Sequence, residues 1–160
     1  MILRALTLWE PWLQAILDGH KTVENRSWEP GPVLLGAPLV LALHAGRFER
    51  KDAEWCRETF GLAYDARDPR WAARRGRVLA LAVVEAVSGP GGSRASPWAF
   101  GPRCWWLRFV TPAPETPSLR GHQGLWRLPE PHEAALAPLA RSLSDRLLDE
   151  EAARGERLMR

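Results

Sequence analysis

The segment 78–84, Val-Leu-Ala-Leu-Ala-Val-Val, is the most apolar run in the chain and limits its fold more than any other feature. An uncharged run of this length is typical of a strand that is buried on both faces. A second apolar run, 39–43, follows Pro38 and has the same character. We therefore expect a sheet in which 78–84 is the central strand and 39–43 is another buried strand.

Weaker periodic patterns predict the remaining elements. Alternating apolar residues predict strands over 2–8, 104–110 and 125–128, and helical spacing predicts helices over 11–19, 49–60 and from Glu133 onward. Gly19 is suited to end the first of these helices. Because neighbouring strand residues point to opposite faces, we expect at most one of Trp105 and Trp106 to be fully buried.

Composition permits a nucleic-acid partner without requiring one. The 160 residues suit one compact domain, with a net charge of +3 and all but Lys21 and Lys51 of the 22 basic residues being arginine. Arginine forks match phosphates, although biased codon usage would give the same excess of arginine. The two cysteines form neither a disulfide framework nor a metal-binding spacing, so we expect a cytoplasmic protein without a bound metal. No apolar run approaches the length of a membrane span.

The segment 19–28, Gly-His-Lys-Thr-Val-Glu-Asn-Arg-Ser-Trp, concentrates charge where a strand is expected. One interpretation is a charged edge strand that resists pairing with other sheets. The other is the wall of a cleft that holds an anionic or hydrogen-bonding ligand. In an ideal strand Glu24 and Arg26 share one face with Trp28. Lys21 lies just after Gly19, where the backbone need not be a regular strand, so strand alternation does not tell which way its side chain points.

Glu85 ends the central apolar run, so its carboxylate lies close to a dry segment. If this carboxylate is buried it needs a partner, because an unpaired buried charge is very unfavourable. Lys21 and Arg26 are the candidate partners. Alternatively, Glu85 reaches solvent, as most glutamates do.

Several of these segments together resemble one known family. They are Leu6-Thr7-Leu8-Trp9-Glu10-Pro11-Trp12, the G-x-K-x-x-E-x-R pattern from Gly19 to Arg26, His44-Ala45-Gly46, Trp98-Ala99-Phe100-Gly101-Pro102 and Gly124-Leu125-Trp126-Arg127-Leu128. The chain is similar to the ASCH domain, a branch of the PUA-like superfamily. The resemblance covers residues 1–129 and leaves 130–160 as a helical extension that packs on the domain or on a partner.

The resemblance implies an α+β fold, a PUA-like small β-barrel with flanking helices and a cleft between the barrel and the first helix. RNA or a nucleotide or nucleoside is the ligand class that it implies, with DNA possible as well. No membrane partner and no cofactor is implied, and the oligomeric state is left open.

One branch of the family consists of amidohydrolases that remove the acetyl group of N4-acetylcytidine with a lysine, a threonine and a glutamate. Only Lys21 matches that set, because Glu24 occupies the threonine position. Glu85 is a substitute for the acid at a position that the family does not use. An enzyme built on Lys21, Glu24 and Glu85 would need water as the attacking group. The pattern therefore favours binding over catalysis.

The sequence is also compatible with two further functions. The helix beyond residue 133 could serve as a protein-interaction module. A ribonuclease would need a general base of near-neutral pKa, for which His20 and His44 are the candidates.

The expected binding site combines the charged segment with nearby aromatic residues. Lys21 would anchor the ligand, Glu24 would accept a hydrogen bond from a base, and Arg26 would pair with Glu24 or hold a phosphate. Aromatic faces stack on bases. Further contacts are expected from Trp9, Trp12, Trp28, His44, Arg47 and Trp98. If Lys21 holds the ligand, Lys21→Ala weakens binding with little loss of stability; if it belongs to a structural pair, the melting temperature falls instead.

Overall fold

The computed structural model describes residues 2–34, 38–91 and 94–159, which form an α+β fold around one mixed sheet. The elements are, in chain order, β1 (Arg4–Glu10), α1 (Trp12–Leu17), β2 (Val23–Arg26), α2 (Gly31–Leu34), β3 (Leu39–Phe48), α3 (Arg50–Phe60), α4 (Arg70–Arg74), β4 (Val78–Ser88), β5 (Arg103–Pro112), β6 (Leu125–Arg127) and α5 (Glu130–Leu158). The strands and helices predicted above are confirmed, and α2 and α4 are short helices outside those predictions.

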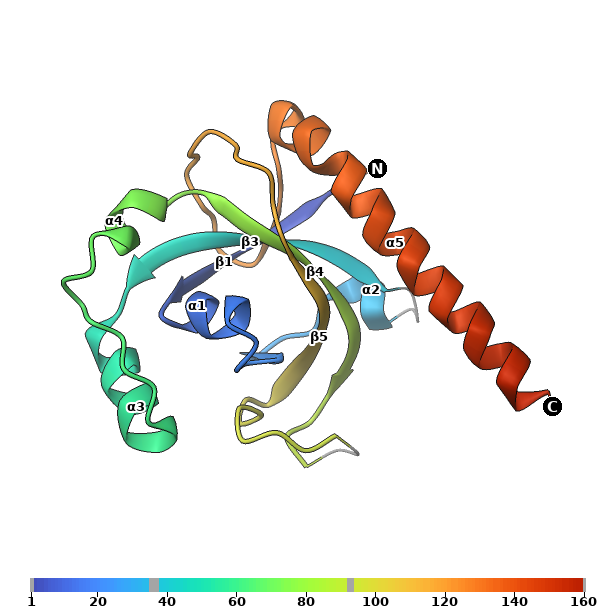
Figure 1. Cartoon of the computed structure of the whole chain (residues 1–160), viewed down its shortest axis with the longest axis horizontal. Coiled ribbons are helices and arrows are strands. Elements are labelled where there is room, and N and C mark those ends of the chain that lie inside the picture. The colour runs from blue at the N-terminus through green and yellow to red at the C-terminus, as the bar shows by residue number, and fades with distance from the viewer. Residues whose placement is uncertain (1, 35–37, 92–93, 160) are drawn as a thin grey trace.

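The six strands of the sheet are ordered β2-β5-β4-β3-β1-β6. The most apolar run forms β4, which lies in the interior of the sheet between β5 and β3, as expected for a central strand. β1 is parallel to β3, whereas β2, β4 and β6 are antiparallel to their neighbours. The sheet is strongly curved, and β3, β4 and β5 bend around α1 (Figure 1).

The α+β class is confirmed, but the expected small β-barrel is not closed, because within the described residues the edge strands β2 and β6 do not pair with each other. β6 has three residues and pairs with Arg4 to Leu6 only. Among the strands of the described residues, none therefore pairs with Thr7 to Glu10 on that side of β1, and the four-residue β2 pairs with β5 instead. The curved sheet leaves an opening beside the second half of β1.

Each face of the curved sheet has its own apolar core. On the inner face, Leu13 and Ile16 of α1 pack in a cluster with β-strand residues that include Leu43 and Trp105. On the outer face, the α5 residues Leu136, Ala140, Leu143 and Leu147 pack on the sheet. These four residues form an apolar stripe on the face of α5 that contacts the sheet. The end of α5 extends beyond the sheet (Figure 1).

Trp105 is fully buried and Trp106 nearly so, with 0% and 6% of their surface exposed, so the expectation that at most one of them is fully buried is confirmed, although by a small margin. Trp105 belongs to the inner core, whereas Trp106 lies in a third cluster with Cys56 and Trp98. Residues distant in sequence thus cover the second face of β5.

Within the described part of the chain, no helix combines the length and apolar character that a membrane crossing requires.

Candidate functional site

The charged segment begins where α1 ends. Gly19 follows the last turn of the helix with a φ of 79°, a left-handed conformation that favours glycine, so its expected role as the helix stop is confirmed. The Lys21 amide then donates to the Ala15 carbonyl at 3.0 Å, which folds the chain back against α1. This return places Lys21 beside the helix and starts β2 two residues later.

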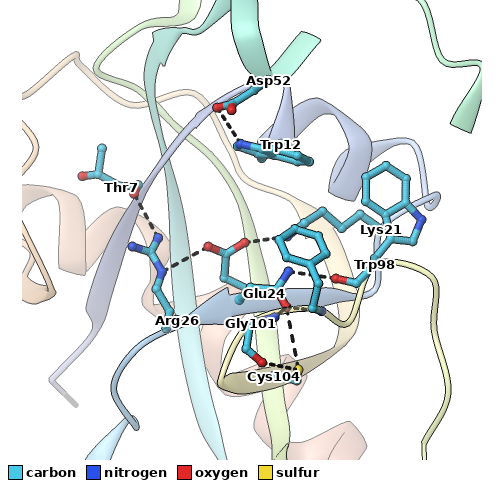
Figure 2. Close-up of polar contacts among 11 residues, drawn as sticks. Thr7, Trp12, Lys21, Glu24, Arg26, Asp52, Trp98, Gly101 and Cys104 are labelled. Carbon is cyan, nitrogen blue, oxygen red and sulfur yellow. Dashed lines mark hydrogen bonds and ion pairs between the residues drawn. The ribbon is translucent and has the colours of Figure 1, made fainter. Parts of the chain in front are cut away.

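Lys21, Glu24 and Arg26 converge, as Figure 2 shows. Lys21 Nζ donates to Glu24 Oε2 at 2.6 Å, and Arg26 Nε lies 3.1 Å from Glu24 Oε1. The predicted shared face of Glu24 and Arg26 is therefore confirmed. Lys21 and Glu24 are, however, only 2% and 7% exposed, so both lie in the interior. Two cations satisfy the carboxylate, as a buried charge requires.

Arg26 connects this buried cluster to β1. Its Nη2 donates to the Thr7 carbonyl at 3.4 Å, just beyond the part of β1 that pairs with β6. The Arg26 side chain is partly exposed, with 24% of its surface accessible. Of the three charged groups, Arg26 alone lines the groove described next. Arg26 is therefore the group through which the cluster reaches solvent.

A groove of about 840 Å³ lies beside the second half of β1. Its walls come from the ends of β1, β2 and β3 and from two connecting segments. They include Thr7, Trp9, Arg26, Trp28, His44, Gly46, Arg47, Arg75, Arg120, Gly121 and His122. Four arginines and no aspartate or glutamate are among the described residues that line it. The groove is therefore suited to an anion.

Two of the four arginines are already engaged by carboxylates. Arg26 pairs with Glu24, and Arg47 pairs with Glu49 at 2.5 Å while its guanidinium stacks 4.4 Å from the centroid of the Trp9 ring. Arg75 and Arg120 are exposed, and the described part of the chain places no carboxylate within ion-pair distance of either. These last two are thus the cations most available to a ligand.

Thr7 and His44 form a hydrogen-bonded pair in the wall of the groove. The Thr7 hydroxyl lies 3.1 Å from His44 Nδ1, and His44 Nε2 lies 3.1 Å from the Leu119 carbonyl. Burial is the main reason that the pKa of His44 is lowered from its usual value. The imidazole is therefore neutral at pH 7.

The structure divides the predicted contact residues into two groups. Trp9, Arg26, Trp28, His44 and Arg47 line the groove. The other four are packed behind it or against the aromatic cluster of α1 and α3. They are Trp12, Lys21, Glu24 and Trp98.

Trp98 illustrates why these residues face inward. Its ring stacks on Phe60 with the centroids 3.8 Å apart, and only 5% of its surface is exposed. Asn25, on the face of β2 opposite Glu24, accepts from the amide of Gly101 at 2.9 Å and donates to the Trp98 carbonyl at 2.8 Å. A Cβ at Gly101 would lie 2.6 Å from the Asn25 Cβ, so a glycine is required there. The Trp98-to-Pro102 motif therefore has a structural explanation.

Glu85 does not join Lys21 and Glu24, so the three do not form one site. Its carboxylate pairs with Arg94 and, at 3.1 Å, with Arg108, which also contacts Glu150 of α5. Neither candidate partner, Lys21 or Arg26, therefore pairs with Glu85, because its carboxylate belongs to the ion-pair network beside α5.

Within the described residues, no group of three or more side chains is placed to hold a metal ion.

The sequence interpretation missed Arg75, Arg120 and His122 as groove residues. Arg75 lies in an arginine-rich connection, and the other two lie between Leu119 and Gly124. Two contacts hold this second segment in place: the Leu119 amide donates to the Gly76 carbonyl at 2.7 Å, and the Leu119 carbonyl is bound by His44. Only the fold brings these segments together.

No protein-family model and no curated protein matches the chain. Among solved structures, the crystal structure of ASCH from Zymomonas mobilis is similar, with a TM-score of 0.52 and 20% sequence identity over 86% of this chain and 94% of that chain. A mutant of that Zymomonas mobilis protein aligns with a TM-score of 0.48 and 17% identity, over 86% of this chain and 95% of that chain. The likeness to the first structure shows that this chain has the fold of an ASCH protein.

Proposed function

We propose that this chain, which has the ASCH fold, binds RNA or a nucleotide in the groove beside β1. The observation that carries the proposal is the lining of the groove: four arginines, exposed indole surface and no described carboxylate. Arginine pairs with phosphate through two parallel hydrogen bonds, and aromatic rings stack on bases. A volume of 840 Å³ falls within the range of about 300–1,000 Å³ that is typical of small-ligand sites.

Single-stranded ligands fit this lining better than duplexes do. Bases in a duplex are stacked on one another, so their faces are not available to an indole ring. Trp9 is the aromatic residue best placed for stacking, because 46% of its surface is exposed. Trp28 is more engaged, since its ring packs edge-on against buried Trp105 with the centroids 4.8 Å apart. We therefore assign the phosphates to the arginines and one base to Trp9.

Replacing Trp9 with alanine is expected to weaken the binding of single-stranded RNA by about 1–3 kcal/mol, or about 5- to 150-fold, because one stacking platform is lost. The dissociation constant can be measured by fluorescence anisotropy of a labelled oligonucleotide. Trp55→Ala is the matched control, because Trp55 is also partly exposed but lies on α3, outside the groove. Equal affinity of Trp9→Ala and wild type would remove Trp9 from the site.

The arrangement does not favour an amidohydrolase. Lys21 Nζ is buried and donates to Glu24, and Glu85 is held by arginines next to α5. The arrangement also does not favour a protein-interaction module at the last helix, because the leucines of the first part of α5 pack on the sheet and are not available to a partner. The groove remains the region with the strongest chemical indication of a ligand.

A further inference from the structure

Thr7, His44 and the Leu119 carbonyl are arranged as a nucleophile, a base and the group that orients the base. A carbonyl oxygen only accepts hydrogen bonds, so the 3.1 Å contact with Leu119 places a proton on His44 Nε2. In neutral imidazole the other nitrogen, Nδ1, is then an acceptor. The Thr7 hydroxyl, 3.1 Å from Nδ1, therefore donates to His44.

Two further contacts fix the Thr7 hydroxyl. The Trp126 indole donates to Thr7 Oγ1 at 3.2 Å, so the oxygen accepts one hydrogen bond while its own proton faces His44. Gly121 lies against the pair: a Cβ there would come within 2.4 Å of Thr7 Oγ1 and 2.7 Å of His44 Cε1. Only glycine allows this approach, which lets the segment with the Leu119 carbonyl reach Nε2.

The pair also lies where a ligand phosphate is expected. Thr7 and His44 are lining residues of the arginine groove, and Thr7 is partly exposed. Arg26 donates to the Thr7 carbonyl, so one of the groove cations is held next to the hydroxyl-bearing residue. Nucleophilic catalysis needs a hydroxyl within hydrogen-bond reach of a base that a third group orients. All three parts are present in this arrangement.

We propose that Thr7 is a nucleophile and His44 its general base in the hydrolysis of a phosphomonoester held in the groove. This inference rests on the proposed function, because the groove must first bind the phosphate of a nucleotide or of an RNA end. A monoester is favoured over a diester because it carries up to two negative charges on one group, which suits several arginines around one volume.

The reaction balances in two steps. Thr7 Oγ1 attacks phosphorus as its proton passes to His44 Nδ1; the bond from phosphorus to the leaving oxygen breaks, and Nδ1 returns the proton to that oxygen. Water then attacks the phosphothreonine, the bond from Oγ1 to phosphorus breaks, and the proton of the water passes through His44 to Thr7 Oγ1. The products are an alcohol and inorganic phosphate. The neutral state of His44 at pH 7, which follows from its lowered pKa, is the state that the first step requires.

The test uses the full chain, p-nitrophenyl phosphate and the 5′-monophosphates of adenosine, cytidine, guanosine and uridine, with release of phosphate as the readout. Thr7→Val keeps the shape of the side chain but removes the hydroxyl, and is expected to slow release by about 100-fold or more, as is His44→Gln. Thr7→Ser retains a hydroxyl and is expected to restore most of the rate. Intact-mass analysis of wild type is expected to show one added phosphoryl group, and the same analysis of Thr7→Val is expected to show none.

Melting temperatures of all variants are compared with wild type, and rescue by Thr7→Ser separates a chemical role of the hydroxyl from a loss of folding. Full activity of Thr7→Val, or no phosphate release by wild type from any of the five probes, would overturn the inference. Binding of the four nucleotides to wild type is measured in parallel. Binding without release overturns the Thr7–His44 assignment alone, whereas the absence of both overturns the proposed function as well.

Discussion

Replacing Lys21 with alanine is expected to lower the free energy of unfolding by about 3–5 kcal/mol, because removal of one partner from a buried ion pair is strongly destabilising. Lys21 is 2% exposed and its Nζ lies 2.6 Å from the buried Glu24 carboxylate. After the substitution, Glu24 keeps only Arg26, which is itself partly exposed and also engaged with Thr7. Urea denaturation of wild type and variant measures the difference directly.

Two comparisons make this result specific. Lys51→Ala removes the only other lysine, which is exposed on α3, and is expected to change stability by less than about 0.5 kcal/mol. The double variant Lys21→Met with Glu24→Leu replaces the pair by apolar groups and should recover much of the loss. If Lys21→Ala unfolds at the same urea concentration as wild type but binds ligand weakly, Lys21 is a ligand anchor and its structural assignment is wrong.

Charge reversal of Arg75 and Arg120 is expected to have the largest effect on binding. The double variant Arg75→Glu with Arg120→Glu should weaken the binding of single-stranded RNA by about 3 kcal/mol, or more than about 100-fold, because two phosphate-binding cations become repulsive anions. Both residues are exposed and line the groove. Their substitution is therefore expected to leave the melting temperature nearly unchanged.

The matched control is the double variant Arg141→Glu with Arg154→Glu. Both arginines are exposed on α5 and neither lines the groove, so this variant changes the net charge by the same amount at a different place. Its affinity should fall only modestly, through the weaker long-range field. Equal losses in the two double variants would mean that RNA responds to net charge and that the groove is not a specific site.

Local sequence patterns predicted most of the elements, because each pattern depends on residues close in sequence. The two apolar runs form β3 and β4. The alternation of side chains along a strand correctly placed Glu24 and Arg26, which are two residues apart, on one face. Burial of Lys21 could not be predicted in this way, because it depends on how the chain folds back onto α1 after Gly19. The charge density of 19–28 suggested exposure, whereas internal pairing allowed burial.

Features that need distant segments to meet were the ones that local patterns missed. A closed barrel would require the edge strands β2 and β6 to pair with each other. In the described structure these strands have only four and three residues and do not pair, which local sequence patterns did not indicate. Trp98 follows the motif in sequence, yet its ring is covered by Phe60 of α3. Arg75 and Arg120 line the same groove but come from two connecting segments that are distant in sequence. Their spacing in the sequence therefore did not indicate that they lie in one site.

The claim that the arginine groove binds single-stranded nucleic acid is tested most directly by a salt titration of RNA affinity. The dissociation constant of a short labelled single-stranded RNA is measured with the wild-type chain at increasing salt concentration. Phosphate contacts from Arg75 and Arg120 alone predict a slope of about −1.4 for the logarithm of the association constant against the logarithm of the salt concentration, and contacts from all four groove arginines predict about −3. Saturable binding with a slope in this range supports the account. No saturable binding at low salt, or an affinity that does not change with salt, would contradict it.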